Sequence, residues 1–206
     1  MTITQIVLLT QEADGDVLAN VLREFNPRLA KITVVPDKAA LDALPLEALA
    51  GARLISFCSS VIVPAAILNA FPGPSYNFHP GPPDRPGRFP SVFAIYERAK
   101  IFGVTVHEMI AKVDAGPIVA AEWFDLPPDS EVAALELRAL GVLFSIFKRL
   151  APFLAMNPSA LPRIYVPWTG EKRTKAQCDV ICRLTPDLDD DEIALRTRAC
   201  GTFLRS

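Results

Sequence analysis

The distribution of apolar residues predicts alternating strands and helices along the first half of the chain. Short, uninterrupted apolar runs lie at residues 3–9, 32–35, 53–57 and 75–78. Such runs are typical of parallel strands covered on both faces. Helices are expected between them: one capped by Asp14 or Asp16 and ending near Phe25, a weaker one over 38–49, and one over 64–70. The alternation predicts an α/β fold with a doubly wound, mostly parallel sheet.

The second half of the chain predicts two more strands and a long helix. A short helix is expected over 91–100 and strands over 102–109 and 118–124. An apolar stripe then predicts a helix over 131–156. Beyond Asn157 the composition shifts to proline, charged and aromatic residues, with one short helix expected over 189–200. We therefore expect a main domain over residues 1–156 and a short C-terminal extension over residues 157–206.

The charge balance argues against a nucleic-acid partner. The 206 residues include 21 Lys and Arg against 23 Asp and Glu, a formal net charge of −2. A general nucleic-acid binder usually shows a basic stripe, and none is visible here. A small or mid-sized ligand is the better expectation.

One uncharged segment raises the question of a membrane span. Residues 54–83 carry no charge, and their apolar part over 54–71 is just long enough to cross a bilayer. Serines interrupt this part and Pro64 follows them, so a buried strand, a turn and a short helix are expected, and no membrane contact. The first residues have no basic leading region, so no signal peptide is expected and the protein is predicted to be cytoplasmic.

The four cysteines show no disulfide framework. Cys178 and Cys182 are four residues apart, which is helical spacing and not the Cys-x-x-Cys of most zinc sites. Together with Cys58 and Cys200 they are expected to be reduced thiols.

Three polar residues in the middle of the chain are the candidates for chemistry. His79 follows a predicted strand and opens a proline-rich loop, and Asn77 lies two residues earlier, so both side chains point to the same side of an extended segment. Asp114 lies on the next glycine-flanked loop. In such sheets ligands bind beyond the carboxyl ends of the strands. An amide, an imidazole and a carboxylate there suit acyl transfer to an amine: Asn NH2 and an imidazolium stabilise the oxyanion, and the carboxylate helps to remove the amine proton.

The spacing of these residues leaves other readings open. A histidine at a strand end is often a hydrogen-bonded buried side chain, and an asparagine before a proline-rich loop is often a turn former. A metal site built from His79, His107 and Asp114 is also conceivable, but no compact His-x-His or His-Glu-x-x-His spacing supports it. We expect no metal.

Two ordered motifs resemble the formyltransferase family, which includes glycinamide ribonucleotide, methionyl-tRNA and sugar N-formyltransferases. The stretches are YNFHPGPPDRPG and FGVTVHEMIAKVDAGPIV, and a weaker resemblance covers about residues 1–155. The family signature is Asn-x-His-Pro, then Gly-Val-Thr-x-His, then Asp-x-Gly-Pro-Ile. Its residues fall on Asn77, His79 and Pro80, then Gly103, Val104, Thr105 and His107, then Asp114, Gly116, Pro117 and Ile118.

The resemblance implies a Rossmann-like formyltransferase catalytic domain that uses 10-formyltetrahydrofolate as donor. It carries over Asn77, His79 and Asp114 as catalytic residues, and His107 and Thr105 in structural or supporting positions. It also implies a pterin pocket built largely from backbone groups of two short segments. Their residues are Ser60, Val61 and Ile62, and Ala111, Lys112 and Val113.

Departures from the family pattern limit the acceptor. Glycinamide ribonucleotide enzymes carry a glycine-rich phosphate loop after the first strand, whereas residues 10–15 here are acidic with one glycine. The roughly fifty residues after the main domain are too few for the C-terminal barrel of the methionyl-tRNA enzymes. The form of the loop at 79–83 is closer to sugar N-formyltransferases and to the formyltransferase-like domains of hydrogenase-maturation proteins. The expected activity is therefore formylation of a small amine, such as a nucleotide-linked amino sugar.

A second hypothesis is a formyltransferase-like folate-binding or scaffold module that does not transfer the formyl group. The intact Asn77, His79 and Asp114 favour the enzyme. A homodimer is compatible with the sequence, which fixes neither the oligomeric state nor the acceptor.

Overall fold

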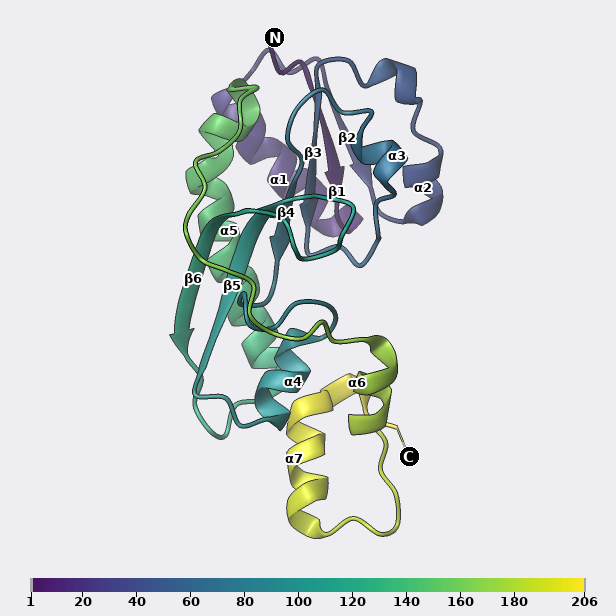
Figure 1. The fold of residues 1–206 in the computed structure, drawn as a ribbon, viewed down its shortest axis with the longest axis vertical. Coiled ribbons are helices and arrows are strands. Elements are labelled where there is room, and N and C mark those ends of the chain that lie inside the picture. Colours follow the sequence, from purple (N-terminus) through teal and green to yellow (C-terminus); the bar gives the residue numbers. More distant parts are fainter. Residues whose placement is uncertain (1, 206) are drawn as a thin grey trace. The chain divides into compact units, whose positions relative to one another are not determined.

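The computed structural model describes residues 2–205, and within them a single six-stranded sheet forms the framework of the fold (Figure 1). The strand order is β2-β1-β3-β4-β5-β6. Strands β1 to β4 pair in parallel, with Gln5 opposite Lys31 and Ala52, and Ile55 opposite Tyr76. The strands are β1 (Gln5–Leu9), β2 (Lys31–Val35), β3 (Ala52–Phe57), β4 (Tyr76–His79), β5 (Ile101–Glu108) and β6 (Ile118–Asp125).

The loop between β5 and β6 is short. The Glu108 N–H donates to the carbonyl of Pro117 at 2.9 Å, which closes the loop at its base. A parallel pair needs a crossover of about a dozen residues or more, so this connection makes β5 and β6 an antiparallel hairpin. The mostly parallel α/β sheet predicted from the sequence is confirmed.

The helices follow the predicted positions, except that the helix expected over 38–49 is divided into an α-helix over Lys38–Asp42 and a 3-10 helix over Leu46–Ala48. There are two further differences. Helix α1 begins at Glu12 with Gln11 as its N-cap, so Asp14 lies inside the first turn and neither Asp14 nor Asp16 caps it. The second difference is α6, which was not predicted. The helices are α1 (Glu12–Phe25), α2 (Lys38–Asp42), η1 (Leu46–Ala48), α3 (Ala65–Leu68), α4 (Pro90–Tyr96), α5 (Val132–Met156), α6 (Lys175–Ile181), α7 (Asp190–Cys200) and η2 (Gly201–Phe203).

Helix α6 has a start signal that is readable in the sequence. The Thr174 side chain accepts a hydrogen bond from the Gln177 N–H, and the Gln177 side chain accepts one from the Thr174 N–H. This reciprocal pair is a capping box, whose pattern of Thr followed three residues later by Gln marks a helix start.

The chain folds into two compact units that are not contiguous in sequence. The first unit comprises residues 1–79, 106–120 and 144–165, and the second comprises residues 80–105, 121–143 and 166–206. Because both units draw on both sides of residue 156, they do not test a domain boundary there. That boundary stays a prediction.

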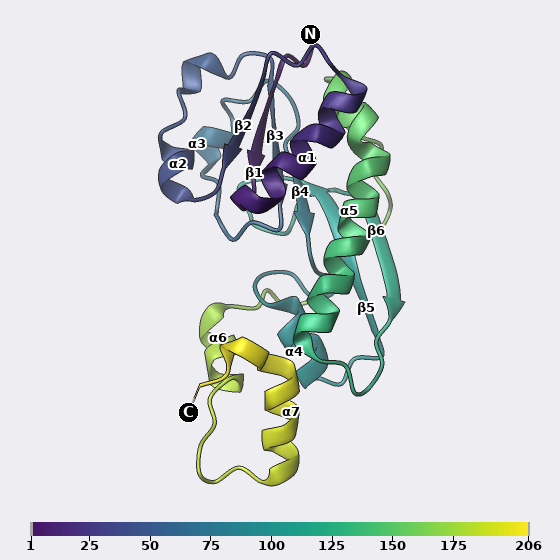
Figure 2. The same cartoon turned by 180° about the vertical axis from the view of Figure 1, so that it is seen from behind.

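In the first unit, helices cover both faces of the parallel strands. Helix α1 lies on one face, and α2 and α3 lie on the other (Figures 1 and 2). Val7 and Leu54 form one buried cluster with Leu41 of α2 and Ile67 of α3. Successive strand residues point to opposite faces of the sheet. The side chain of Leu8, which is also buried, therefore lies on the face opposite to that of Val7.

The other face of the first unit packs against the C-terminal half of α5. Phe57 of β3, Phe78 of β4 and Phe147 of α5 form an aromatic cluster with ring centroids 5.3 to 5.9 Å apart. Tilted and edge-to-face rings at these separations add to the stability gained from their burial. Phe78 therefore fixes which side of β4 faces α5, and Asn77 and His79 point to the opposite side.

A buried arginine stabilises the end of α5. The Arg53 guanidinium donates to the carbonyls of Leu154 at 3.0 Å and Ser159 at 3.1 Å. Burial lowers the pKa of Arg53, although the nearby Tyr76 opposes this shift. Carbonyls at the end of a helix have no hydrogen-bond partner within the helix. The guanidinium therefore provides a donor for carbonyl groups that would otherwise be buried without a hydrogen bond.

Helix α5 is long and apolar enough to cross a membrane by length and composition alone, with a mean hydropathy of 1.6 over its most apolar window. The core helix of a soluble domain has the same property. Leu143, Phe147 and Leu154 of α5 are fully buried within the protein, so its composition alone is weak evidence for a membrane span.

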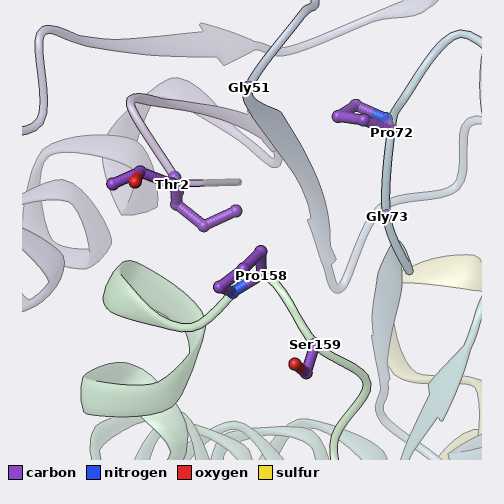
Figure 3. Close-up of a pocket in the computed structure, with 7 residues that line it drawn as sticks. Thr2, Gly51, Pro72, Gly73, Pro158 and Ser159 are labelled. Atoms are coloured by element: carbon purple, nitrogen blue, oxygen red, sulfur yellow. The ribbon is translucent and has the colours of Figure 1, made fainter.

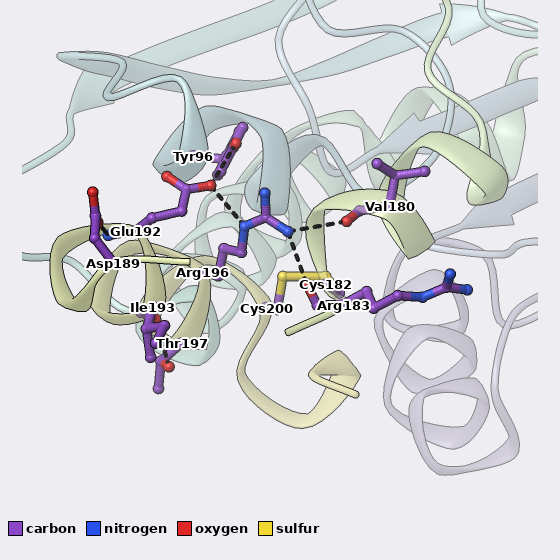
Figure 4. Close-up of polar contacts among 10 residues, drawn as sticks. All are labelled: Tyr96, Val180, Cys182, Arg183, Asp189, Glu192, Ile193, Arg196, Thr197 and Cys200. Atoms are coloured by element: carbon purple, nitrogen blue, oxygen red, sulfur yellow. Dashed lines mark hydrogen bonds and ion pairs between the residues drawn. A yellow bond between two sulfur atoms is a disulfide. The ribbon is translucent and has the colours of Figure 1, made fainter. Parts of the chain in front are cut away.

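The second unit contains a disulfide bond between Cys182 and Cys200, which joins the end of α6 to the end of α7 (Figure 4). Their Cα atoms are 5.5 Å apart. The prediction that all four cysteines are reduced thiols is wrong for this pair, and it holds for Cys58 and Cys178. The pairing depends on the way α6 and α7 pack, which sequence spacing does not show.

A polar cluster accompanies the disulfide in the second unit. Glu192 of α7 accepts a hydrogen bond from the Tyr96 hydroxyl at 2.8 Å and one from Arg196 Nε at 2.6 Å. The same Arg196 donates to the carbonyl of Arg183 at 2.7 Å (Figure 4). These contacts connect α7 with α4 and with the segment after α6.

We expect that Cys200→Ser lowers the free energy of unfolding by about 2 to 4 kcal/mol, because the disulfide restricts the unfolded chain. Urea unfolding without reductant measures the change, and Cys58→Ser is the matched control because Cys58 forms no disulfide. Reductant should bring the wild-type curve to that of Cys200→Ser. Equal stability of Cys200→Ser and wild type without reductant would contradict the prediction.

Candidate active site

Asn77 and His79 lie at the carboxyl end of β4, on the side of the strand opposite Phe78. The sequence suggested that His79 is the first residue of the loop, but in the structure it is the last residue of the strand. The parallel register places Asn77 opposite Ser56 of β3. Strand β4 lies between β3 and β5 in the sheet. These two neighbouring strands hold the backbone that carries Asn77 and His79.

Asp114 is brought to the same place by the β5–β6 hairpin. Its φ of 49° is left-handed, a conformation that Asp adopts more readily than most residues. The Met109 N–H donates to the Ser75 carbonyl at 2.8 Å and so ties the start of this loop to the residue before β4. The loop conformation and its attachment together direct the Asp114 carboxylate toward β4.

Gly116 allows the hairpin loop to close tightly. A Cβ atom at this position would lie 1.9 Å from the carbonyl oxygen of Glu108, which no side chain could occupy. The glycine of the Asp-x-Gly-Pro-Ile motif is therefore required by the close approach of two backbone segments. This close approach also holds the Glu108 carbonyl in a fixed position.

The three predicted catalytic residues meet in the first unit, together with His107. Asp114 Oδ2 lies 3.8 Å from His79 Nδ1, and Asp114 Oδ1 lies 3.5 Å from Asn77 Nδ2. His107 Nε2 lies 3.1 Å from Asn77 Nδ2 and 3.3 Å from Asp114 Oδ1. His79, His107 and Asp114 are at most 6% exposed, whereas Asn77 is half-buried.

This arrangement places a buried carboxylate between two buried imidazoles and a half-buried amide. A negative charge this close stabilises a positive charge on His79. An imidazolium in a dry site is a strong donor toward a developing oxyanion, and the carboxylate is a proton acceptor. The geometry suits acyl transfer. It requires no serine or cysteine nucleophile.

Thr105 has the supporting position expected for it, within the second unit. Its hydroxyl is fully buried and donates to the carbonyl of Gly81 at 2.8 Å. Gly81 belongs to the proline-rich loop that follows His79. The hydrogen bond therefore anchors this loop to β5.

The two segments expected to bind the pterin are irregular and partly exposed. Residues 60–62 lie between β3 and α3, where the Val61 N–H donates to Ser59 Oγ at 3.2 Å. Ala111 and Lys112 are exposed in the β5–β6 loop, and Val113 is half-buried. Backbone groups outside helices and strands are available to a ligand, so both segments fit the expected role. Their binding role itself stays a prediction.

Sequence reasoning missed Glu108 and Arg163. The Arg163 guanidinium donates two hydrogen bonds to the Glu108 carboxylate, at 2.9 and 3.0 Å. This bond to Glu108 raises the pKa of Arg163 above its ordinary value. The two residues are 55 positions apart, and Arg163 lies in the segment after α5, so no local pattern connects them.

A cavity of about 210 Å³ lies elsewhere in the first unit (Figure 3). Its wall includes residues that precede β1, β3 and β4, so it lies at the amino ends of the parallel strands. Ligands of such sheets bind at the carboxyl ends, where Asn77 and His79 lie. The labelled lining residues are Thr2, Gly51, Pro72, Gly73, Pro158 and Ser159.

A metal site is not supported within residues 2–205. No group of three or more His, Cys, Asp or Glu side chains there is arranged to hold a metal ion. This disagrees with the alternative in which His79, His107 and Asp114 are ligands.

Comparison with protein families gives a match to the model described as "Formyl transferase" over residues 40–142, half of the chain. No curated protein sequence matches the chain. Solved structures that do match share its fold at low sequence identity.

Three of these structures differ in how much of each is covered. A sugar N-formyltransferase from a Shewanella species is 16% identical with a TM-score of 0.72, over 96% of this chain and 88% of its own. An N-formyltransferase from Helicobacter canadensis, in complex with folinic acid and dTDP-3-aminofucose, is 15% identical with a TM-score of 0.70, over 96% and 80%. HypX from Aquifex aeolicus, in complex with tetrahydrofolic acid, is 20% identical with a TM-score of 0.66, over 96% and 34%.

We expect that Gly116→Ala destabilises the protein by about 1 to 3 kcal/mol, the usual cost of forcing an extra methyl group into a closed space. Urea unfolding measures the change. Gly141→Ala is the matched control, because its added Cβ meets nothing within 4 Å and lies in the interior of α5. That control should stabilise by about 0.5 to 1 kcal/mol. An unchanged stability for Gly116→Ala would show that the loop relaxes and that its tight closure is not needed.

Proposed function

Because the chain belongs to the formyl transferase family, we propose that it transfers a formyl group from 10-formyltetrahydrofolate to the amine of a nucleotide-linked amino sugar. The observation that carries the proposal is the convergence of Asn77, His79 and Asp114 at the carboxyl end of the sheet. Asp114 lies within 3.8 Å of the other two and is almost fully buried.

The folate donor is supported by two kinds of observation. Structures with the same fold are known in complex with folinic acid and with tetrahydrofolic acid. In this chain, residues 60–62 offer irregular backbone near the end of β3, which lies beside β4. The edge of a pterin presents alternating donors and acceptors, which backbone N–H and C=O groups match.

The acceptor is proposed from the fold relatives and from the start of α1. The Helicobacter enzyme was captured with a dTDP-linked amino sugar. The segment after β1 enters α1 directly, with Glu12 and Asp14 in its first turn. Negative side chains oppose a phosphate at this helix end, so a glycinamide ribonucleotide acceptor bound there is disfavoured.

In the proposed reaction the amine attacks the formyl carbon, and His79 stabilises the negative charge that develops on the formyl oxygen. Asp114 accepts the proton that the amine loses, directly or through a water molecule. The bond between the formyl carbon and the folate nitrogen then breaks, and that nitrogen takes up a proton. Burial strengthens each of these electrostatic contacts, because little water competes with them.

We expect that His79→Ala and Asp114→Ala each lower kcat for formyl transfer by about a hundredfold or more, the usual scale for losing an oxyanion donor or an acid–base group. Mass spectrometry of a panel of dTDP-linked amino sugars incubated with 10-formyltetrahydrofolate identifies the acceptor and gives the rate. The exposed Asp129→Ala is the matched control and should keep the wild-type rate.

Binding of a reduced-folate analogue to these variants should change much less than turnover. Near-wild-type turnover by either variant would show that the assigned mechanism is wrong. A wild-type protein that binds the analogue but formylates no amine in the panel would favour the scaffold hypothesis.

We also expect that a reduced-folate analogue protects backbone amides of residues 60–62 and 111–113 from hydrogen exchange, and raises the unfolding temperature by mass action. Exchange measured by mass spectrometry with and without the analogue tests this. Residues 12–16 serve as the internal control, because α1 is assigned no folate contact. Protection confined to residues beyond 157 would contradict the proposed location of the folate-binding site.

A further inference from the structure

Residues 161–164, which follow α5, are bonded to two strands of the first unit through their backbone. The Leu161 N–H donates to the hydroxyl of Tyr76 on β4 at 2.7 Å, in a buried hydrogen bond. The Ile164 N–H donates to the carbonyl of Ile118 on β6 at 2.8 Å. The segment therefore attaches to the sheet at both of its ends.

A third contact of this segment is made by a side chain. The Arg163 guanidinium donates two hydrogen bonds to the carboxylate of Glu108 on β5, and this paired geometry fixes the orientation of both groups. The Arg163 side chain is 61% exposed and the Glu108 side chain is 12% exposed. A largely exposed ion pair adds little to the stability of a fold. Its main effect is therefore expected on the position of Glu108 and not on folding.

The points of attachment surround the loop that carries Asp114. Glu108 and Ile118 lie at the two ends of this loop, and the Glu108 N–H closes its base. Tyr76 directly precedes Asn77 on β4. One segment thus holds both ends of the loop and also the strand that carries two neighbours of the carboxylate.

The contacts of Asp114 are sensitive to the position of this loop. Its Oδ2 lies 3.8 Å from His79 Nδ1, and its Oδ1 lies 3.5 Å from Asn77 Nδ2. Both distances exceed those of most hydrogen bonds, so a small movement of the loop closes or opens these contacts. A misplacement of about 1 Å can lower a rate by about a hundredfold.

We propose that residues 161–164 position Asp114 for catalysis, and that Arg163 is a positioning residue that acts through Glu108. The ion pair holds the base of the loop, and the loop presents the carboxylate to its neighbours on β4. This inference rests on the proposed function. It assigns a catalytic role to part of the predicted C-terminal extension, in agreement with the place of residues 144–165 in the first unit.

The first test examines the base of the loop and needs no turnover. Exchange of the Glu108 and Met109 amides is measured by NMR in the full chain, because these N–H groups donate to Pro117 and Ser75. We expect both amides to exchange about twofold to tenfold faster in Arg163→Met, because local opening becomes easier. Amides of β1 should exchange at the wild-type rate.

The second test measures kcat for formyl transfer per folate-binding site, counted by titration with a reduced-folate analogue, so that unfolded protein does not lower the value. We expect kcat to fall by about tenfold or more in Arg163→Met, because the carboxylate is displaced. Arg163→Lys keeps the charge and a donor, and should recover most of this loss. The matched control is Arg28→Met, which removes an exposed arginine of the same unit and should keep the wild-type kcat.

A double-variant cycle tests whether Arg163 acts through Glu108. Glu108→Gln alone should lower kcat, and the addition of Arg163→Met should cause little further loss, because both changes break the same ion pair. Losses that multiply would show that Arg163 acts by another route, and would overturn the proposal.

A wild-type kcat in Arg163→Met would overturn the positioning role, even if the loop exchanges faster. Equal losses in Arg163→Lys and Arg163→Met would also contradict it. If Arg163→Met does not fold, Arg163→Lys and Glu108→Gln provide the same comparison. A wild-type protein that formylates no amine would refute the proposed function, whereas the exchange of Glu108 and Met109 would still show whether Arg163 holds the loop.

Discussion

The carboxylate of Asp114 organises the site, because its two oxygens face different partners. Oδ2 is directed at His79, and Oδ1 is shared by His107 and the Asn77 amide. A buried carboxylate is costly unless such partners surround it. Its surroundings therefore have to be provided by the fold: β4 supplies two partners, β5 supplies the third, and the hairpin loop holds Asp114 itself in a left-handed conformation.

The adjacency of β4 and β5 makes this arrangement possible. Strand β4 is parallel to β3, and the aromatic packing of Phe78 against Phe57 and Phe147 sets which face of β4 is turned away from α5. Once that face is set, residues 77 and 79 must share the opposite side. The chemistry thus depends on apolar contacts on the far face of the same strand.

Much of this was readable in the sequence, and the exceptions have definite causes. The period-two pattern around Phe78 placed Asn77 and His79 together, and apolar runs located all six strands. The close contact between Gly116 and the Glu108 carbonyl was not readable, because a backbone group leaves no mark in the sequence. The Cys182–Cys200 bond and the Arg163–Glu108 pair were also missed, since both depend on segments that meet only after folding. Helix α6 is different, because its Thr174–Gln177 capping box is a local signal within the sequence itself.

Arg53 has a consequence for how this chain can vary among its relatives. Its charge persists when buried, because a guanidinium does not lose its proton in proteins. Two of its carbonyl partners, on Leu154 and Ser159, lie on either side of the turn that ends α5. An insertion or deletion between them would leave the buried positive charge of Arg53 without one of these hydrogen-bond partners. Length changes at this turn should therefore occur in homologues only together with replacement of the arginine, so that the two features are inherited as a pair.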